Sequence, residues 1–165
     1  MRHPTLGAVL CGLGLLGTSA VSHGQANNGW ALVEQSTSCA MLMEQPDGTL
    51  VAFRVPKSSG DSVNLLLGNS SWRSLADRKR VRLSIYLNGR PQLLKPVSVQ
   101  AREGRYWISI PVSRKFVAQI FKQSITIAIE YERNMIALLP SLAWAESTYI
   151  ATERCAGVAS DPFAN

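Results

Sequence analysis

Histidine is almost absent from this sequence of 165 residues, and both copies, His3 and His23, lie near the amino terminus. We expect both to be removed with a secretory leader. Their loss excludes serine–histidine and cysteine–histidine nucleophiles and histidine-based zinc sites from the mature protein. The mature sequence also lacks a G-x-S-x-G elbow, an S-x-x-K pair and a phosphate-binding P-loop. A non-enzymatic protein without metal or cofactor is therefore the expectation.

Long apolar runs are missing as well, except for one from Leu6 to Gly17. This run is shorter than the roughly 20 residues that a membrane span needs. It follows Arg2 and leads into small residues, which is the pattern of a secretory signal peptide cut after Ala26. We predict three parts: a signal peptide at 1–26, one globular β-rich domain at 27–156 and a flexible tail at 157–165. The mature protein is expected to be soluble, in the periplasm or outside the cell.

Cysteine is scarce, with three copies in the sequence. Cys11 falls in the predicted leader, so the mature protein keeps Cys39 and Cys155. An even pair in an exported protein is typical of a disulfide, and the absence of C-x-x-C argues against a redox pair. We predict a structural Cys39–Cys155 disulfide that closes most of the mature chain into one loop.

Acidic residues are outnumbered, because 11 aspartates and glutamates stand against 17 lysines and arginines, for a net charge of +6. Loss of Arg2 with the leader lowers this charge to +5. A basic exported protein attracts anionic envelope polymers, membrane headgroups or acidic proteins. The expected partner is therefore an envelope protein or an anionic polymer, and nucleic acid is not expected in that compartment.

The strongest local pattern is a hairpin. Apolar and polar residues alternate from Val81 to Leu87, as in a strand with one buried face. Asn88-Gly89 follows, which suits a type I′ turn because both central residues of that turn need positive φ. The return run ends at Val99. Pro96 within it cannot donate a ladder hydrogen bond, so we expect an edge strand or a bulge near Lys95.

A third strand is predicted from Tyr106 to Val112, and we expect the three strands to form an antiparallel meander with one apolar and one basic face. Arginine binds phosphate or carboxylate in a forked geometry, and an aromatic ring stacks on a sugar or a cation. The predicted binding face consists of these residues: Arg73, Arg78, Lys79, Arg80, Arg82, Arg90 and Trp107. The alternative is a solvated sheet edge, where basic side chains prevent stray strand pairing.

The rest of the sequence predicts further short elements. Strands are expected at 30–34, 39–45, 49–55, 63–67, 124–131 and 135–139, and a helical turn at 72–77. Ser113 can cap a helix that runs to about Gln123. A last helix is expected from Ser141 to Cys155, docked through Trp144, Thr148, Ala151 and Cys155. About nine short strands and two helices predict a mostly β, α+β fold: an antiparallel sheet or sandwich with the helices packed on it.

Carboxylates are the remaining candidates for catalysis. Glu130 and Glu132 are two residues apart in a predicted strand, so both side chains should lie on its outward face. Such a pair can hold a cation or act as acid and base, with the spacing deciding the outcome. The alternative is a solvated strand face, where carboxylates are common.

Four features of the sequence, taken together, resemble small exported proteobacterial proteins of no assigned function. These features are the leader, Trp30 before Cys39, the run Trp72-Arg73-Ser74-Leu75 and a final helix that ends at Cys155. The resemblance implies a compartment and no activity. We predict an exported, non-enzymatic binding protein of the bacterial cell envelope. The alternative is an inhibitor or immunity-type protein that acts on an envelope enzyme through a loop at 56–62 or 70–77. A carboxylate-dependent hydrolase is third.

Overall fold

The computed structural model describes residues 29–58, 60–76, 78, 80–93, 96–123, 125–139, 142 and 145–158. Within these ranges the chain forms ten strands and three helices, so the predicted mostly β, α+β class is confirmed. The elements are β1 (Ala31–Glu34), β2 (Ser38–Glu44), β3 (Leu50–Pro56), β4 (Ser62–Asn69), α1 (Arg73–Ala76), β5 (Ser84–Leu87), β6 (Arg90–Leu93), β7 (Val99–Arg102), β8 (Arg105–Ser113), α2 (Arg114–Lys122), β9 (Ile127–Tyr131), β10 (Asn134–Leu139) and α3 (Glu146–Cys155).

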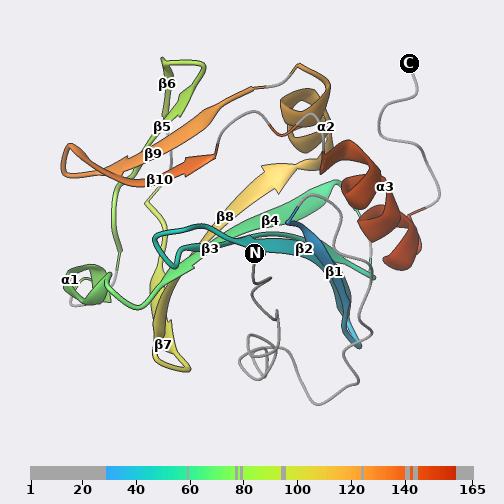
Figure 1. Ribbon diagram of the computed structural model, residues 1–165, viewed down its shortest axis with the longest axis horizontal. Coiled ribbons are helices and arrows are strands. Elements are labelled where there is room, and N and C mark those ends of the chain that lie inside the picture. Colours follow the sequence, from blue (N-terminus) through green and yellow to red (C-terminus); the bar gives the residue numbers. More distant parts are fainter. Residues whose placement is uncertain are drawn as a thin grey trace, which may run out of the picture.

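The strands form two antiparallel sheets. The large sheet has six strands in the order β1-β2-β3-β4-β8-β7, and the small sheet has four in the order β10-β9-β5-β6. Figure 1 shows the large sheet bowed, with the small sheet, α2 and α3 all on one side of it. We call this side the inner face of the large sheet and the opposite side its outer face.

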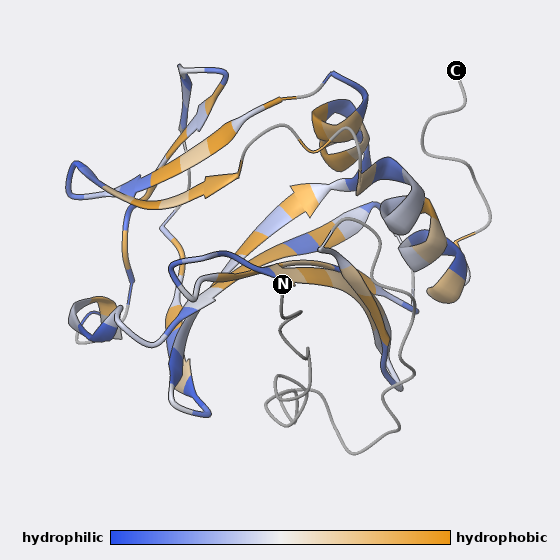
Figure 2. Ribbon diagram, in the orientation of Figure 1, coloured by the Kyte–Doolittle hydropathy of each residue, from blue (hydrophilic) through white to orange (hydrophobic). Residues whose placement is uncertain are grey.

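The core fills the space between the inner face and the layer above it. Every second residue of β4 from Val63 to Leu67 points inward and is at most 1% exposed, as predicted for a central strand. Phe121 of α2 joins the layers, because its ring centre lies 5.6 Å from that of Phe53 on β3 and 5.2 Å from that of Tyr149 on α3. Figure 2 shows polar residues gathered at the hairpin turns, with apolar residues along the strands.

The predicted hairpin is present. β5 pairs with β6 around Asn88-Gly89, and the φ angles of 47° and 76° at these residues match the type I′ turn. A bridge between Val81 and Val97 follows, one residue out of register with the β5–β6 pairs. Lys95, where a bulge was predicted, lies outside the described residues. β6 is also an edge strand of the small sheet, which is one of the two outcomes predicted for the return run.

The predicted meander is wrong, because the return strand changes sheets. β6 belongs to the small sheet, whereas β7 pairs with β8 in the large one. The break falls between residues 93 and 99. Pro96 lies in it and has no N–H to continue a ladder, and an irregular strand of this kind can turn a corner between two packed sheets.

Helix α2 agrees with its prediction at both ends. Ser113 accepts a hydrogen bond at Oγ from the N–H of Phe116 at 3.1 Å, and the helix ends before Gln123. Its buried residues include Val117, Ile120 and Phe121, the stripe that faces the core.

Helix α3 begins at Glu146, later than the predicted Ser141. Ser141 and Trp144 lie outside the described residues. The predicted docking stripe is confirmed at Thr148, which is buried, and at Cys155, which forms the disulfide, but Ala151 is only half-buried. Its buried residues are Thr148, Tyr149, Thr152 and Glu153.

Arg114 at the start of α2 stabilises Glu153 in this buried position. Arg114 Nε donates to Glu153 Oε1 at 2.8 Å, and the two side chains are only 15% and 2% exposed. The hydrogen bond raises the pKa of Arg114 above its ordinary value. Burial, together with the nearby Glu153 carboxylate, raises the pKa of Tyr149. A charged pair thus joins α2 to α3 beside the apolar core.

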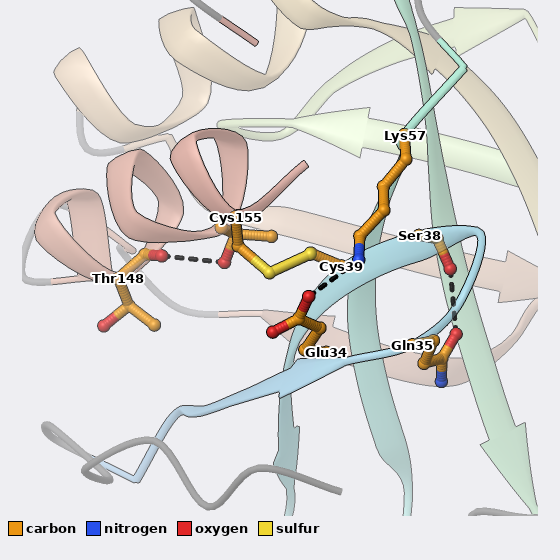
Figure 3. Close-up of a disulfide and its surroundings, with 8 residues drawn as sticks. Glu34, Gln35, Ser38, Cys39, Lys57, Thr148 and Cys155 are labelled. Atoms are coloured by element: carbon orange, nitrogen blue, oxygen red, sulfur yellow. Dashed lines mark hydrogen bonds and ion pairs between the residues drawn. A yellow bond between two sulfur atoms is a disulfide. The ribbon is translucent and has the colours of Figure 1, made fainter. Parts of the chain in front are cut away.

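The predicted disulfide between Cys39 of β2 and Cys155 at the end of α3 is present, with Cα atoms 6.0 Å apart and a sequence separation of 116. Figure 3 shows it between strand and helix, next to an ion pair in which Lys57 Nζ lies 2.7 Å from Glu34 Oε1. The bond fastens α3 beside β1 and β2 at one edge of the large sheet.

None of the three helices in the described ranges is long and apolar enough to cross a membrane. The predicted signal peptide, and all of the predicted tail except residues 157 and 158, lie outside the described residues.

Candidate binding site on the outer sheet face

The outer face of the large sheet contains a hollow of about 210 Å³, which we call the outer hollow. Its apolar lining comes from five strands and consists of Val33, Ala40, Leu42, Leu50, Ala52, Leu66 and Trp107. The other lining residues are polar: Gln35, Arg54, Ser98, Gln100, Arg102 and Ser109. Strands β1 to β4, β7 and β8 therefore all contribute to one surface.

The strand register explains the shape of the outer hollow. Ala52 of β3 lies between Leu42 of β2 and Leu66 of β4 in the paired strands. All three side chains are on the outer face, because strand residues two apart share a face and the neighbouring Phe53 and Leu65 point into the core. A short side chain between two long ones leaves an apolar depression.

Trp107 forms one side of this depression. It pairs with Gly68 of β4, and a Cβ atom on Gly68 would lie 2.6 Å from the indole Cε3 atom. The indole ring therefore packs directly against the backbone of Gly68. Any larger residue at position 68 would displace the ring. The indole Nε1 is enclosed and has no hydrogen-bond acceptor among the described residues. Trp107 is thus held in place by packing while its polar atom is unpaired.

Arg54 and Arg102 give the outer hollow a positive charge. Neither makes an ion pair or a side-chain hydrogen bond within the described part of the chain, and no acidic residue lines the hollow. By the strand register they lie six residues apart along the strands and three strands apart across them. With about 3.4 Å per residue and about 4.8 Å between strands, a flat sheet would place their Cα atoms about 25 Å apart, and the bow of the sheet shortens this distance. The two cations lie toward opposite ends of the apolar surface.

The residues of the predicted binding face do not form one surface. Trp107 is on the outer face of the large sheet, whereas Arg90 begins β6 of the small sheet on the inner side. Figure 1 shows the β5–β6 turn far from α1, which carries Arg73. The change of sheets after β6 separates Arg90 from Trp107, whereas α1 contacts β7 and β8 of the large sheet. Arg80 and Arg82 are exposed beside the buried Val81.

Arg78 is already engaged, and Lys79 lies outside the described residues. The Nη1 atom of Arg78 is 2.9 Å from Glu132 Oε1, and its guanidinium carbon is 5.9 Å from the centre of the Tyr131 ring. Both partners of the ion pair are more than half exposed, so the pair adds little stability. Among the described residues of the predicted binding face, only Trp107 lines the outer hollow, together with Arg54 and Arg102.

The prediction that Glu130 and Glu132 share one strand face is wrong. β9 ends at Tyr131, and Glu132 lies in the following turn with a φ angle of 49°. Glu132 is also paired with Arg78, whereas Glu130 stands opposite Ser84 of β5. The turn breaks the alternation that would have placed the two carboxylates side by side.

One group of metal-ligating side chains occurs among the described residues: Glu34, Cys39 and Cys155, whose ligand atoms lie within 4.8 Å of one another. Both sulfur atoms are joined in the disulfide, and Glu34 is paired with Lys57 (Figure 3). These three side chains lie together because of the disulfide and the ion pair beside it.

Sequence reasoning missed Arg54 and Arg102 as site residues. A signal was present, because the run Leu65-Leu66-Leu67 does not alternate and so predicts a strand that is apolar on both faces. Arg54 lies between the buried Phe53 and Val55, so its side chain points to the opposite, outer face. Joining these signals into one site requires the pairing of strands that are distant in the sequence.

Comparison of this chain with protein-family models, with curated proteins and with solved structures finds no match. Its function is therefore inferred from its own residues and geometry.

Proposed function

We propose that this chain is an exported, non-enzymatic binding protein of the bacterial cell envelope, which receives a negatively charged partner on the outer face of its large sheet. The observation that carries the proposal is the outer hollow, where Arg54 and Arg102 have no side-chain partner among the described residues and Trp107 is held against an apolar surface. Export is supported by the leader pattern at 1–26 and by the disulfide, which is typical of oxidising compartments.

The charges of the outer hollow select the kind of partner. Two guanidinium groups without carboxylate partners leave a positive potential beside apolar side chains, so a partner that presents negative charge next to an apolar group is favoured. Tryptophan and arginine are also the residues that most often contribute a large share of the binding energy at interfaces. An acidic envelope protein or an anionic polymer satisfies both conditions.

The test is capture of a partner from an envelope extract by the mature protein, at low and at high salt. One variant combines Arg54→Gln with Arg102→Gln, and a matched control combines Arg133→Gln with Arg154→Gln, two exposed arginines away from the outer hollow. Both variants lose two positive charges. We expect at least tenfold weaker capture for the outer-hollow variant alone, because hydrogen bonds to charged groups contribute about 1.5–3 kcal/mol each. Equal effects in the two variants would contradict the proposed site.

A third variant, Arg80→Gln with Arg82→Gln, tests the arginine-rich segment that the sequence predicted. Weaker capture in this variant alone would place the partner on that segment. The salt dependence separates two functions, because exposed charge contacts are screened whereas a packed interface is not. A protein partner that survives high salt and blocks an envelope enzyme would favour the inhibitor or immunity-type function.

A further inference from the structure

We propose that the ligand of the outer hollow is a single-tailed anionic amphiphile, an alkyl or acyl tail that carries one carboxylate, sulfate or phosphate. This inference rests on the proposed function and names the class of ligand for the same site. The tail lies in the apolar depression, and the head group binds an arginine at its end.

The size and lining of the outer hollow fit a tail. Leu42, Leu50, Leu66 and Trp107 present apolar side chains around the small Ala52. The volume of about 210 Å³ is below the roughly 300–1,000 Å³ of pockets that enclose whole drug-sized ligands. A space of this size holds part of an alkyl tail.

The charged residues fit the head group. Arg54 and Arg102 have no side-chain partner within the described ranges, and a guanidinium group binds carboxylate or phosphate through two parallel hydrogen bonds. Among the described residues that line the hollow none is acidic, so none of them favours a cationic head group.

The outer hollow fits a single amphiphile taken up from solution better than it fits the surface of a bilayer. Proteins that rest on a bilayer insert protruding apolar side chains into it, whereas the apolar residues here line a recess. The two most exposed large apolar side chains of the described chain are Met135 and Leu138, at 56% and 45%, and both are on β10 of the small sheet. The recess therefore takes one tail from solution.

The test is calorimetric titration of the mature protein with sodium dodecanoate below its micelle concentration. Decanoate and octanoate vary the tail, and dodecyltrimethylammonium and dodecyl maltoside vary the head group at constant tail length. We expect saturable binding of one dodecanoate per protein. Each methylene that enters the hollow should lower the Kd about fourfold until the hollow is filled. The cationic and neutral amphiphiles should bind at least tenfold more weakly than dodecanoate.

Variants locate the ligand. Leu66→Asn removes an apolar wall of the hollow, and Leu138→Asn is the matched control because it makes the same change at an exposed site on β10. We expect at least a tenfold rise in the dodecanoate Kd for Leu66→Asn and no change for Leu138→Asn. Arg54→Gln and Arg102→Gln, measured singly, identify the arginine at the head group. The tail and head-group series use the unaltered protein, so they decide the question even if a variant does not fold.

Three results would overturn the inference: no saturable binding of dodecanoate, equal binding of dodecyltrimethylammonium, or an unchanged Kd in Leu66→Asn. The inference would also be overturned if the mature protein floated with anionic lipid vesicles but did not bind dodecanoate. The outer face would then bind a bilayer. Failure of this inference differs from failure of the proposed function. Capture of an envelope partner that depends on Arg54 and Arg102, without amphiphile binding, removes the ligand class and leaves the binding function in place.

Discussion

Loss of the Cys39–Cys155 disulfide is expected to cost this protein a large part of its stability. The bond closes a loop with a sequence separation of 116. In the chain-entropy model a loop of this length restricts the unfolded chain by about 4.9 kcal/mol at 25 °C. Folded domains are stable by only about 5–15 kcal/mol, so the reduced protein should be close to its limit of stability.

Urea unfolding of the oxidised and the reduced protein, followed by circular dichroism and tryptophan fluorescence, measures this effect without a substitution. With a urea dependence of about 2 kcal/mol per molar, the midpoint should fall by about 2.4 M on reduction. The variant Cys39→Ala with Cys155→Ala should behave like the reduced protein. A fall below about 0.5 M would refute the loop-entropy reasoning. So would a separate early transition confined to α3, because the bond would then hold one helix and not the whole chain.

Three further predictions concern single elements. Ser113→Ala should lower the free energy of unfolding by about 1 kcal/mol in urea, with Ser113→Asp close to the original protein, because the side chain caps α2. Burial raises the pKa of Tyr149 above its ordinary value of 10, so its contribution to stability is present below pH 10 and is lost as the pH rises further. Urea midpoints between pH 8 and pH 11 should therefore fall more steeply in the original protein than in Tyr149→Phe. Gly68→Ala should cost about 1–3 kcal/mol through contact with Trp107, and the cost should largely vanish when Trp107→Ala is also present, as a double-mutant cycle would show.

Local features of the fold could be predicted because they depend on neighbouring residues. The Asn88-Gly89 turn follows from the positive φ angles that only a few residues adopt easily. The capping of α2 by Ser113 and its buried stripe follow from helical spacing. The disulfide could be predicted by elimination, since an exported chain with two remaining cysteines has one pairing.

The path of the return strand could not be predicted from such patterns. Alternation shows which side chains of a strand are buried, but it does not show which sheet buries them. Val97 and Val99 fit either sheet, and the structure separates them, since Val97 bridges to Val81 while Val99 pairs with Ile108 of the large sheet. This one change of sheets placed Arg90 and Trp107 in different sheets.

Part of the buried face of α3 was missed for a different reason. Apolar spacing finds a helix face only when that face is apolar, and α3 buries Thr152 and Glu153. Glu153 is tolerated there because Arg114 donates a hydrogen bond to it from another helix. Removal of Arg114 would leave Glu153 as a buried, unpaired charge, which costs several kcal/mol. The local sequence around Glu153 does not reveal that this partner is present.

The two faces of the large sheet separate stability from binding. Leu65 and Phe53 on the inner face are at most 1% exposed, and full burial of such side chains contributes about 1.5–3 kcal/mol each. Leu66 on the outer face is only half-buried, so a polar residue in its place removes a smaller part of that energy. An antiparallel sheet whose outer face only meets water commonly alternates apolar with polar residues. Leu66 and Trp107 depart from this alternation beside two unpaired arginines, and substitutions at these positions are therefore expected to change binding more than stability.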